Sequence, residues 1–294
     1  MNTRNIRFRS NRVRDIIALF HEELDSMYGN GEVGAFLEIL FNAFLGWDRV
    51  RLLTSREQTI DQSDLLRFHW ALEDLKQCRP IQHIVGYTDF CGCRIDVSPN
   101  VLIPRPETEE IVNWTLHNLP PYHSSPTILD LCTGSGCIAI ALKKSLPCAI
   151  VTAVDISAAA LEMARQNAKS NGVEVRFVEG DVLGDTNVAT AQYSLIVSNP
   201  PYVMEKEREQ MHRNVLNYDP PLALFVPDND PLCFYRAIAT IAQRLLARQG
   251  LLVVEINEAL APETASLFVE HGFTTSVHTD FRGKPRWISA TINP

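Results

Sequence analysis

Four residues, Asn-Pro-Pro-Tyr at positions 199–202, carry the clearest chemical signal in this sequence. They follow an apolar run over residues 193–198 that is typical of a buried strand. Asn199 offers a side-chain oxygen, and the carbonyl of Pro200 is kept out of strand pairing by the proline after it. Two acceptors at the end of a strand can hold a planar NH2 group, against which the ring of Tyr202 can lie.

Such an arrangement suits transfer of a group to an amide nitrogen. That nitrogen is a poor nucleophile, because its lone pair is shared with the carbonyl. Two acceptors can fix its plane and stabilise the positive charge that develops as the conjugation is lost. No strong base is needed before attack, so the remaining work is alignment of the reacting atoms. Asn199, Pro200 and Tyr202 are therefore the predicted catalytic residues.

A second signal lies upstream, in the run Asp130-Leu-Cys-Thr-Gly-Ser-Gly136. It follows another apolar run, and its last four residues are typical of a turn from strand into helix whose backbone approaches a ligand closely. Asp155 ends the next predicted strand, where a carboxylate can accept both ribose hydroxyls of a nucleoside. Asp181 could meet the adenine amino group, and Val182 could pack on the base.

The glycine turn alone leaves the cofactor open. Gly134 and Gly136, with Asp155 about 20 residues on, also fit a dinucleotide-binding turn. Asp130 favours S-adenosylmethionine, because a pyrophosphate is repelled by a nearby carboxylate whereas a sulfonium and an ammonium are attracted by one. Asp155 could instead cap the following helix, but Ser157 is the better candidate for that cap. Together the two runs predict a methyltransferase that acts on an amino or amide nitrogen.

Composition excludes some function classes. The net charge of −8 and a pI near 5.5 argue against broad binding to nucleic acid, which needs many Lys and Arg. No apolar run approaches the ~20 residues of a membrane span. The seven cysteines are odd in number and irregularly spaced, which indicates reduced thiols and a cytoplasmic protein. Cys91 and Cys93 could be half of a metal site, but no second pair has zinc spacing, so no metal is predicted.

The pattern along the chain predicts three parts. Residues 1–79 show helical periodicity, with Gly29 breaking the first helix and Ser63 capping the third. Residues 80–100 read as a β-hairpin linker with strands at 84–90 and 93–97. Residues 101–294 form the third part. Strands and helices alternate there from Thr127 onward, which favours a mostly parallel, Rossmann-like seven-stranded sheet covered on both faces. The predicted strands are 127–132, 149–155, 174–178, 193–198, 251–256, 273–278 and 286–292, and the predicted helices are 136–146, 157–171, 231–247 and 261–271.

The order of these motifs resembles that of the peptide chain release factor glutamine methyltransferases, the HemK-like family. The most family-specific part runs from Pro80-Ile-Gln-His-Ile-Val-Gly86 to Val101-Leu-Ile-Pro-Arg-Pro-Glu-Thr-Glu109. The residues from Asp130 to Gly136 resemble the family's cofactor loop. Ser198-Asn-Pro-Pro-Tyr202 resembles its substrate motif, which adenine methyltransferases share. Weaker similarity continues at Asp219-Pro-Pro-Leu-Ala-Leu-Phe225 and Asp280-Phe-Arg-Gly-Lys-Pro-Arg286.

The resemblance implies a class I methyltransferase domain that methylates the N5 amide of the glutamine in the Gly-Gly-Gln loop of class 1 release factors. It implies S-adenosyl-L-methionine as donor, S-adenosyl-L-homocysteine as product, and a helical N-terminal domain that helps hold the release factor. A monomer that binds neither nucleic acid nor membrane is expected. The implied donor contacts are Cys132, Thr133, Gly134, Ser135, Gly136, Asp155 and Asn199, and the implied glutamine contacts are Asn199, Pro200, Pro201 and Tyr202.

This chain departs from the family pattern at a few positions. Cys132 replaces a common glycine, which should narrow the cofactor loop, and Val182 stands where an aromatic residue is frequent. Whether Glu107 and Thr108 touch the donor or only brace the linker stays open. Two other classes also remain: an adenine-N6 nucleic-acid methyltransferase, since the same motif can hold an adenine amino group, and a non-catalytic nucleotide-binding module.

Overall fold

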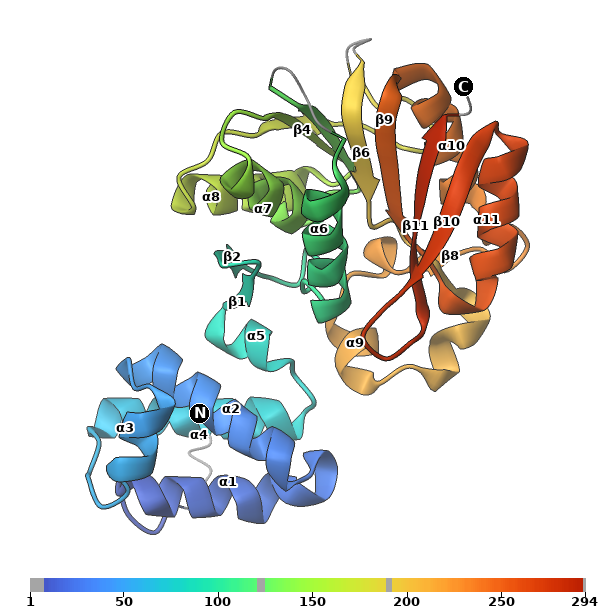
Figure 1. The fold of residues 1–294 in the computed structure, drawn as a ribbon. Coiled ribbons are helices and arrows are strands. Elements are labelled where there is room, and N and C mark those ends of the chain that lie inside the picture. The colour runs from blue at the N-terminus through green and yellow to red at the C-terminus, as the bar shows by residue number, and fades with distance from the viewer. Residues whose placement is uncertain (1–7, 121–124, 189–191, 293–294) are drawn as a thin grey trace. The chain divides into compact units, whose positions relative to one another are not determined.

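The computed structural model describes residues 8–120, 125–188 and 192–292. These form two compact units (Figure 1). The first holds the described residues up to Gly86 together with a much later segment, Arg213–Tyr218. The second holds the described residues of Tyr87–His212 and those from Asp219 onward. Each unit has a buried apolar core of its own.

The described part of the first unit is helical, as the periodicity predicts. Its helices are α1 (Val13–Tyr28), α2 (Asn30–Leu45), α3 (Arg49–Thr54), α4 (Gln62–Lys76), α5 (Ile81–Val85) and α9 (Arg213–Tyr218). Aromatic side chains from α1, α2 and α4 meet inside the largely aliphatic core of this unit. Phe41 and Phe68 lie 4.5 Å apart between ring centroids, and Phe20 meets Phe68 edge-on at 6.3 Å. All three are fully buried, so α1, α2 and α4 pack around one aromatic centre.

Two local predictions in this unit are wrong. The cap residue of α4 is Asp61 and not Ser63, which lies inside the first turn. Ile84 and Val85 belong to helix α5 and not to a strand. Gly86 ends that helix in the left-handed conformation, at φ 88°, and the strand begins only after it. Two β-branched residues in a short apolar run therefore favoured the wrong element, because periodicity is weak over so few positions.

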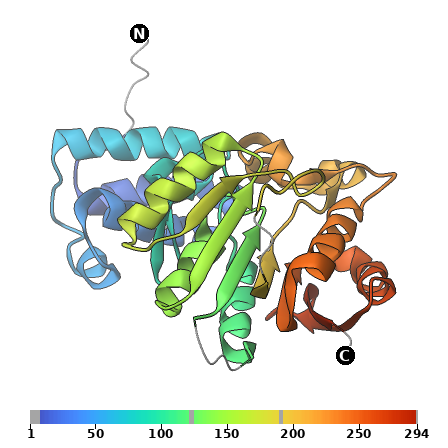
Figure 2. The same ribbon diagram turned by 90° about the horizontal axis from the view of Figure 1, so that it is seen from above.

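The second unit is built on the predicted seven-stranded sheet. Its strands are β3 (Thr127–Leu131), β4 (Ile150–Asp155), β5 (Arg176–Glu179), β6 (Tyr193–Ser198), β9 (Leu246–Glu255), β10 (Phe273–Thr279) and β11 (Pro285–Ile292). The strand order is β10-β11-β9-β6-β3-β4-β5, and β11 runs in the direction opposite to the other six strands. The mostly parallel, doubly covered α/β fold predicted from the sequence is thus confirmed (Figure 2).

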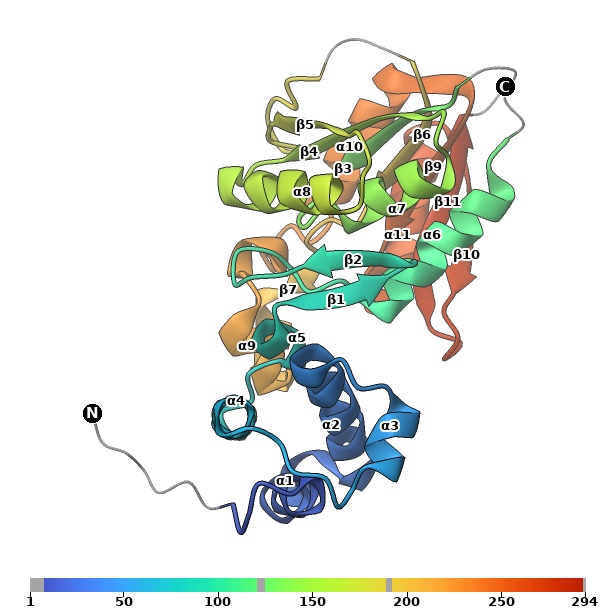
Figure 3. The same cartoon turned by 90° about the vertical axis from the view of Figure 1, so that its left-hand side faces the viewer.

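Helices cover both faces of this sheet (Figure 3). They are α6 (Pro106–Asn118), α7 (Cys137–Ser145), α8 (Ala158–Ser170), α10 (Cys233–Leu245) and α11 (Ala261–Glu270). Successive strand residues face opposite ways, so Ile128 joins the core under α6, α7 and α8 while Leu129 joins the core under α10 and α11. Both are fully buried. Burial on both faces is why these strands read as continuous apolar runs.

Two small pairs of strands accompany the main sheet. The hairpin of β1 (Tyr87–Phe90) and β2 (Cys93–Asp96) packs into the core on the α7 side. A short parallel pair, β7 (Val203–Met204) with β8 (Phe225–Val226), was not predicted. Three 3₁₀ turns complete the unit, at Glu205–Gln210, Pro221–Ala223 and Glu258–Leu260. Among the described residues, no helix has the length and apolar character needed to cross a lipid bilayer.

Candidate active site

A pocket of about 340 Å³ opens where β3, β4 and β6 end at their carboxyl edges. Both sequence signals follow strands that end here, so chain connectivity alone brings them together. The predicted residues that line the pocket are Cys132, Thr133, Gly134, Ser135, Asp155, Asp181, Val182, Asn199 and Pro201. The predicted residues that do not line it are Asp130, Gly136, Pro200 and Tyr202. Residues for which the sequence predicted no role also contribute. Arg105, Pro220 and Leu222 come from the family-like stretches, whereas Ile156, Leu183 and Phe234 lie outside them.

The turn between β3 and α7 uses its two glycines differently. Gly134 has φ +54°, and a Cβ added there would meet no atom within 4 Å, so its backbone faces open space at the pocket wall. Gly136 has φ +81°, and a Cβ there would come within 3.0 Å of the Cβ of Ala164. The first glycine therefore exposes backbone to a ligand, while the second allows α7 and α8 to approach closely. Cys132 also has a positive φ, of 61°, which is uncommon outside glycine.

Asp155 lines the pocket and also holds the glycine turn in place. One carboxylate oxygen accepts the backbone N–H of Gly134 at 2.8 Å, and the other accepts that of Ser157 at 2.9 Å. Burial raises the pKa of Asp155, and these backbone bonds act against that rise. Each oxygen keeps a further lone pair for a ligand. Ser157 caps α8 by accepting the N–H of Ala160, as the sequence predicts.

Asp130 lies behind the turn, where it is fully buried. It accepts the hydroxyl of Thr133 at 2.6 Å, so it supports the turn from below. Burial raises the pKa of Asp130 from 3.8 to about 7, against the opposing effect of the Thr133 hydroxyl. The prediction that Asp130 itself contacts a donor stays a prediction, whereas its contact with Thr133 is a feature of the fold.

The raised pKa of Asp130 makes protein stability depend on pH. The folded protein binds this proton more tightly than the unfolded chain, so the contribution is fully present below pH 3.8 and is lost as pH rises to about 7. In Asp130→Asn the free energy of unfolding should therefore fall less across this window than in the wild type. Urea denaturation at several pH values measures the difference. Asp89→Asn, at an exposed position of β1, is the control, and an Asp130→Asn slope equal to that of the wild type would contradict the expectation.

The loop after β5 brings a further carboxylate to the pocket. Asp181 accepts the N–H of Leu183 at 2.8 Å, and both residues line the wall beside Val182. Gly180 precedes them, and a Cβ there would lie only 2.3 Å from the carbonyl oxygen of Thr186. Glycine is thus required for this loop to close on itself, and the closure sets the direction in which Asp181 leaves the sheet.

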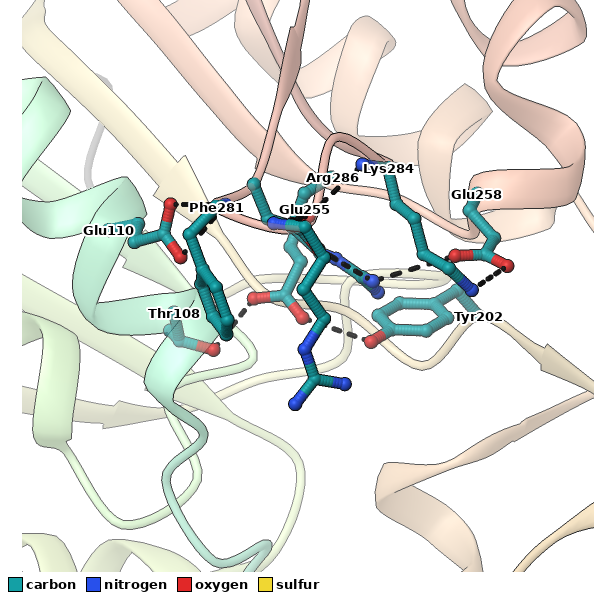
Figure 4. Close-up of polar contacts among 10 residues, drawn as sticks. Thr108, Glu110, Tyr202, Glu255, Glu258, Phe281, Lys284 and Arg286 are labelled. Atoms are coloured by element: carbon teal, nitrogen blue, oxygen red, sulfur yellow. Dashed lines mark hydrogen bonds and ion pairs between the residues drawn. The ribbon is translucent and has the colours of Figure 1, made fainter.

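Asn199 lies at the wall and is held from one side. Its Nδ2 donates to the hydroxyl of Thr108, with 3.3 Å between the atoms, and both residues line the pocket. Tyr202 is directed elsewhere, because its hydroxyl donates to Glu255 at 2.9 Å (Figure 4). The structure therefore answers part of the open question about Thr108: it lines the pocket and contacts the Asn-Pro-Pro-Tyr motif.

An ion pair links two family-like stretches that are distant in the sequence, the one that ends at residue 109 and the one that begins at Asp219. Arg105 forms a short hydrogen bond and ion pair with the buried carboxylate of Asp219, which also accepts the backbone N–H of Ile103 at 3.4 Å. Burial raises the pKa of Asp219, and the positive charge of Arg105 lowers it. The residues that follow, Pro220 and Leu222, line the pocket, so this pair fixes one wall. No group of metal-ligating side chains occurs among the described residues.

Comparison with known structures defines the class of this fold. A crystal structure of a methyltransferase from Pyrococcus furiosus superposes with a TM-score of 0.51 at 18% identity, covering 68% of this chain and 88% of that one. The structure titled "delta-N METTL16 MTase domain" gives 0.50 at 16% identity, covering 69% and 90%. The second unit thus has the Rossmann-like class I methyltransferase fold.

Sequence comparison narrows the class to one family. Family models described as "PrmC N-terminal domain" and "Methyltransferase small domain" match residues 26–86 and 108–224. A "Release factor glutamine methyltransferase" of Flavobacterium psychrophilum is 43% identical over 276 residues, covering 93% of this chain and 96% of that protein. One of Bacteroides thetaiotaomicron is 39% identical, covering 94% and 98%. The chain belongs to the release factor glutamine methyltransferase family.

Proposed function

We propose that this protein transfers a methyl group from S-adenosyl-L-methionine to the side-chain amide nitrogen of a glutamine in a peptide chain release factor. Family membership supports the reaction and the class of substrate. The observation that carries the proposal is the amide of Asn199, which lies at the pocket wall with Nδ2 engaged by Thr108. Its Oδ1 then remains to accept an N–H from a planar amide.

The residues of the pocket fit the proposed donor. S-adenosylmethionine supplies a methyl group activated by a positively charged sulfur. Asp155 and Asp181 provide acidic acceptors for its hydroxyl and amino groups and favour its positive charge. Ile156, Val182 and Leu183 offer apolar surface for a base. Residues 132–135 bring backbone close to the ligand, whereas Asp130 supports this turn from behind.

Alanine at position 134 tests whether the glycine turn contacts the donor. In Gly134→Ala the new Cβ enters the open space at the wall and should lower donor affinity about 10-fold. The positive φ should also cost about 1–2 kcal/mol of stability. Gly172→Ala is the matched control, since Gly172 has φ +68°, no atom within 4 Å and no place in the pocket wall. Calorimetric titration with S-adenosylhomocysteine should show a loss in the first variant only; equal losses would contradict the contact.

The chain's own residues account for how the acceptor is held. The Oδ1 of Asn199, at the pocket wall, would accept one N–H group of the substrate amide. The predicted acceptor for the other is the carbonyl of Pro200, which lies in sequence between the wall residues Asn199 and Pro201. These bonds fix the plane of the amide and stabilise positive charge on its nitrogen in the transition state. Alignment carries the reaction, because the amide proton becomes acidic only as the new bond forms.

The finer parts of the proposal concern the target and the setting. The target is the glutamine of the Gly-Gly-Gln loop in class 1 release factors, methylated at N5, and the enzyme acts as a monomer without binding nucleic acid. All seven cysteines are free thiols, which fits a reducing compartment such as the cytoplasm. Residues 1–79 are assigned to recognition of the release factor, 80–100 to the linker and 101–294 to methyl transfer.

Methyl transfer from labelled donor tests the proposal directly. Incubation with a class 1 release factor should add one methyl group to the peptide that carries Gly-Gly-Gln, as read by mass spectrometry. A release factor whose glutamine is replaced by alanine should receive no label. Duplex and single-stranded DNA are assayed in parallel. Label on DNA but not on the release factor would instead support an adenine methyltransferase.

A further inference from the structure

A buried carboxylate lies next to the Asn-Pro-Pro-Tyr motif without being part of it. Glu255 ends β9 and is 2% exposed. Both of its oxygens are engaged: Oε2 accepts the hydroxyl of Thr108 at 2.7 Å, and Oε1 accepts that of Tyr202 at 2.9 Å (Figure 4). Thr108 comes from α6 and Tyr202 from the loop after β6, so one side chain ties three elements together.

One hydroxyl lies at each oxygen of Glu255, and these two contacts oppose the effect of burial on its charge. Burial raises the pKa of Glu255, while the two hydroxyls and the positive charge of Arg286 lower it. Arg286 is itself held by Asp280, with 3.0 Å between the guanidinium nitrogen and the carboxylate oxygen. A carboxylate has lone pairs but no proton to give, so it accepts from both neighbours.

The direction of these bonds fixes the orientation of Asn199. A threonine hydroxyl carries one proton, and that of Thr108 goes to Glu255. Toward Asn199 its oxygen can therefore only accept, so the amide must present Nδ2 at that contact, where the distance is 3.3 Å. The rotated amide would place two acceptor oxygens against each other. Oδ1 is left for the substrate, which is the orientation that methyl transfer to an amide requires.

We propose that Thr108 and Glu255 are positioning residues, and that the carboxylate of Glu255 sets the polarity of a hydrogen-bond chain that keeps Asn199 Oδ1 available to the substrate amide. The proposal rests on the function proposed above and deepens it. Neither residue needs to touch a reacting atom. Their effect is on how often the acceptor faces the substrate.

A glutamine at position 255 would keep the size of the side chain but would no longer fix the direction of the hydrogen bonds. The NH2 group of this glutamine would donate to the hydroxyl of either Thr108 or Tyr202. When it donates to Thr108, the threonine hydroxyl no longer donates to residue 255 and can donate to Asn199 instead. The amide of Asn199 is then stable in the rotated form, with Oδ1 turned away. In Glu255→Gln kcat should fall about 10-fold or more with little change in the KM for the donor.

Variants at position 108 test the same series of hydrogen bonds at the residue that contacts Asn199. Thr108→Val keeps the shape but lacks the hydroxyl, so kcat should fall as in Glu255→Gln. Thr108→Ser keeps the hydroxyl and should restore most of the activity. The matched control is Glu110→Gln, which makes the same chemical change on the same helix. Glu110 accepts the backbone N–H of Phe281 at 3.1 Å and has no bond to the chain of residues 108, 199, 202 and 255.

Nuclear magnetic resonance of the side-chain amide of Asn199 gives a readout that does not depend on turnover. The signal is assigned by its loss in Asn199→Ala. It should move in Thr108→Val and Glu255→Gln and stay in place in Thr108→Ser and Glu110→Gln. An unmoved signal with near-normal kcat in the first two variants would overturn the proposal. If the wild type fails to methylate a release factor, the proposed function falls, while the amide signal still decides whether the chain of bonds exists.

Discussion

Replacing Asn199 by alanine is expected to lower kcat by about 100-fold or more while leaving donor affinity nearly unchanged. The side-chain oxygen of Asn199 is the proposed acceptor at the pocket wall, and the Nδ2 of the same amide donates to Thr108. Truncation removes an interaction that strengthens as the substrate nitrogen becomes positive, so the loss appears in turnover. Steady-state kinetics with a release factor measures kcat, and calorimetry with S-adenosylhomocysteine measures affinity.

Asn113→Ala supplies the matched control for this variant. Asn113 lies on α6, the helix that carries Thr108, but its side chain is exposed. Its removal should change neither kcat nor donor affinity. If Asn199→Ala retained near-normal turnover, the role of its oxygen as acceptor would be refuted. If both variants lost activity equally, the loss would reflect a disturbed helix α6 or a lower overall stability, and not the missing acceptor.

The motifs that chain connectivity places were predictable from sequence. Asn199 follows β6, Asp155 ends β4 and the glycine turn follows β3, and parallel strands end at one edge of a sheet. Thr108 and Glu255 were not predictable in the same way, because they are 147 positions apart in the chain and meet only once α6 lies on the sheet. Neither the residue types of Thr108 and Glu255 nor their separation in the sequence indicates that they are in contact. What the sequence does offer is the family-like stretch that ends at residue 109.

Short elements were harder to predict than long ones for a physical reason. The long strands and helices carry enough apolar positions for their period to show, and β6 was predicted with the bounds it has. Helices α3 and α5 span 6 and 5 residues, too few for a period to show. Asp48 caps α3 by accepting the N–H of Arg51, whereas α5 follows its cap residue Pro80 without a side-chain cap bond. The membership of Arg213–Tyr218 in the first unit also has no local signal, since Tyr218 donates to the carbonyl of Gln77 across a long separation.

Replacing Asp155 by alanine should weaken donor binding by about 1.5–3 kcal/mol, or roughly 10- to 150-fold in Kd. Its carboxylate is a charged acceptor at the pocket wall for the donor's ribose hydroxyls. It also accepts the N–H groups of Gly134 and Ser157, so truncation loosens the glycine turn that approaches the same ligand. Because both effects act on binding, the loss should appear in donor affinity before it appears in kcat at saturating donor.

Calorimetric titration with S-adenosylhomocysteine separates these effects when Asp155→Asn is measured beside Asp155→Ala. Asparagine keeps one acceptor oxygen, which can still bind the N–H of Gly134, but its NH2 group opposes the N–H of Ser157. Its affinity should therefore fall between those of the wild type and the alanine variant. Asp89→Ala changes the net charge equally at an exposed site of β1 and should bind normally. If the ribose hydroxyls bind the carboxylate of Asp155, removing that carboxylate must lower donor affinity. Unchanged affinity in Asp155→Ala would therefore place the ribose elsewhere in the pocket.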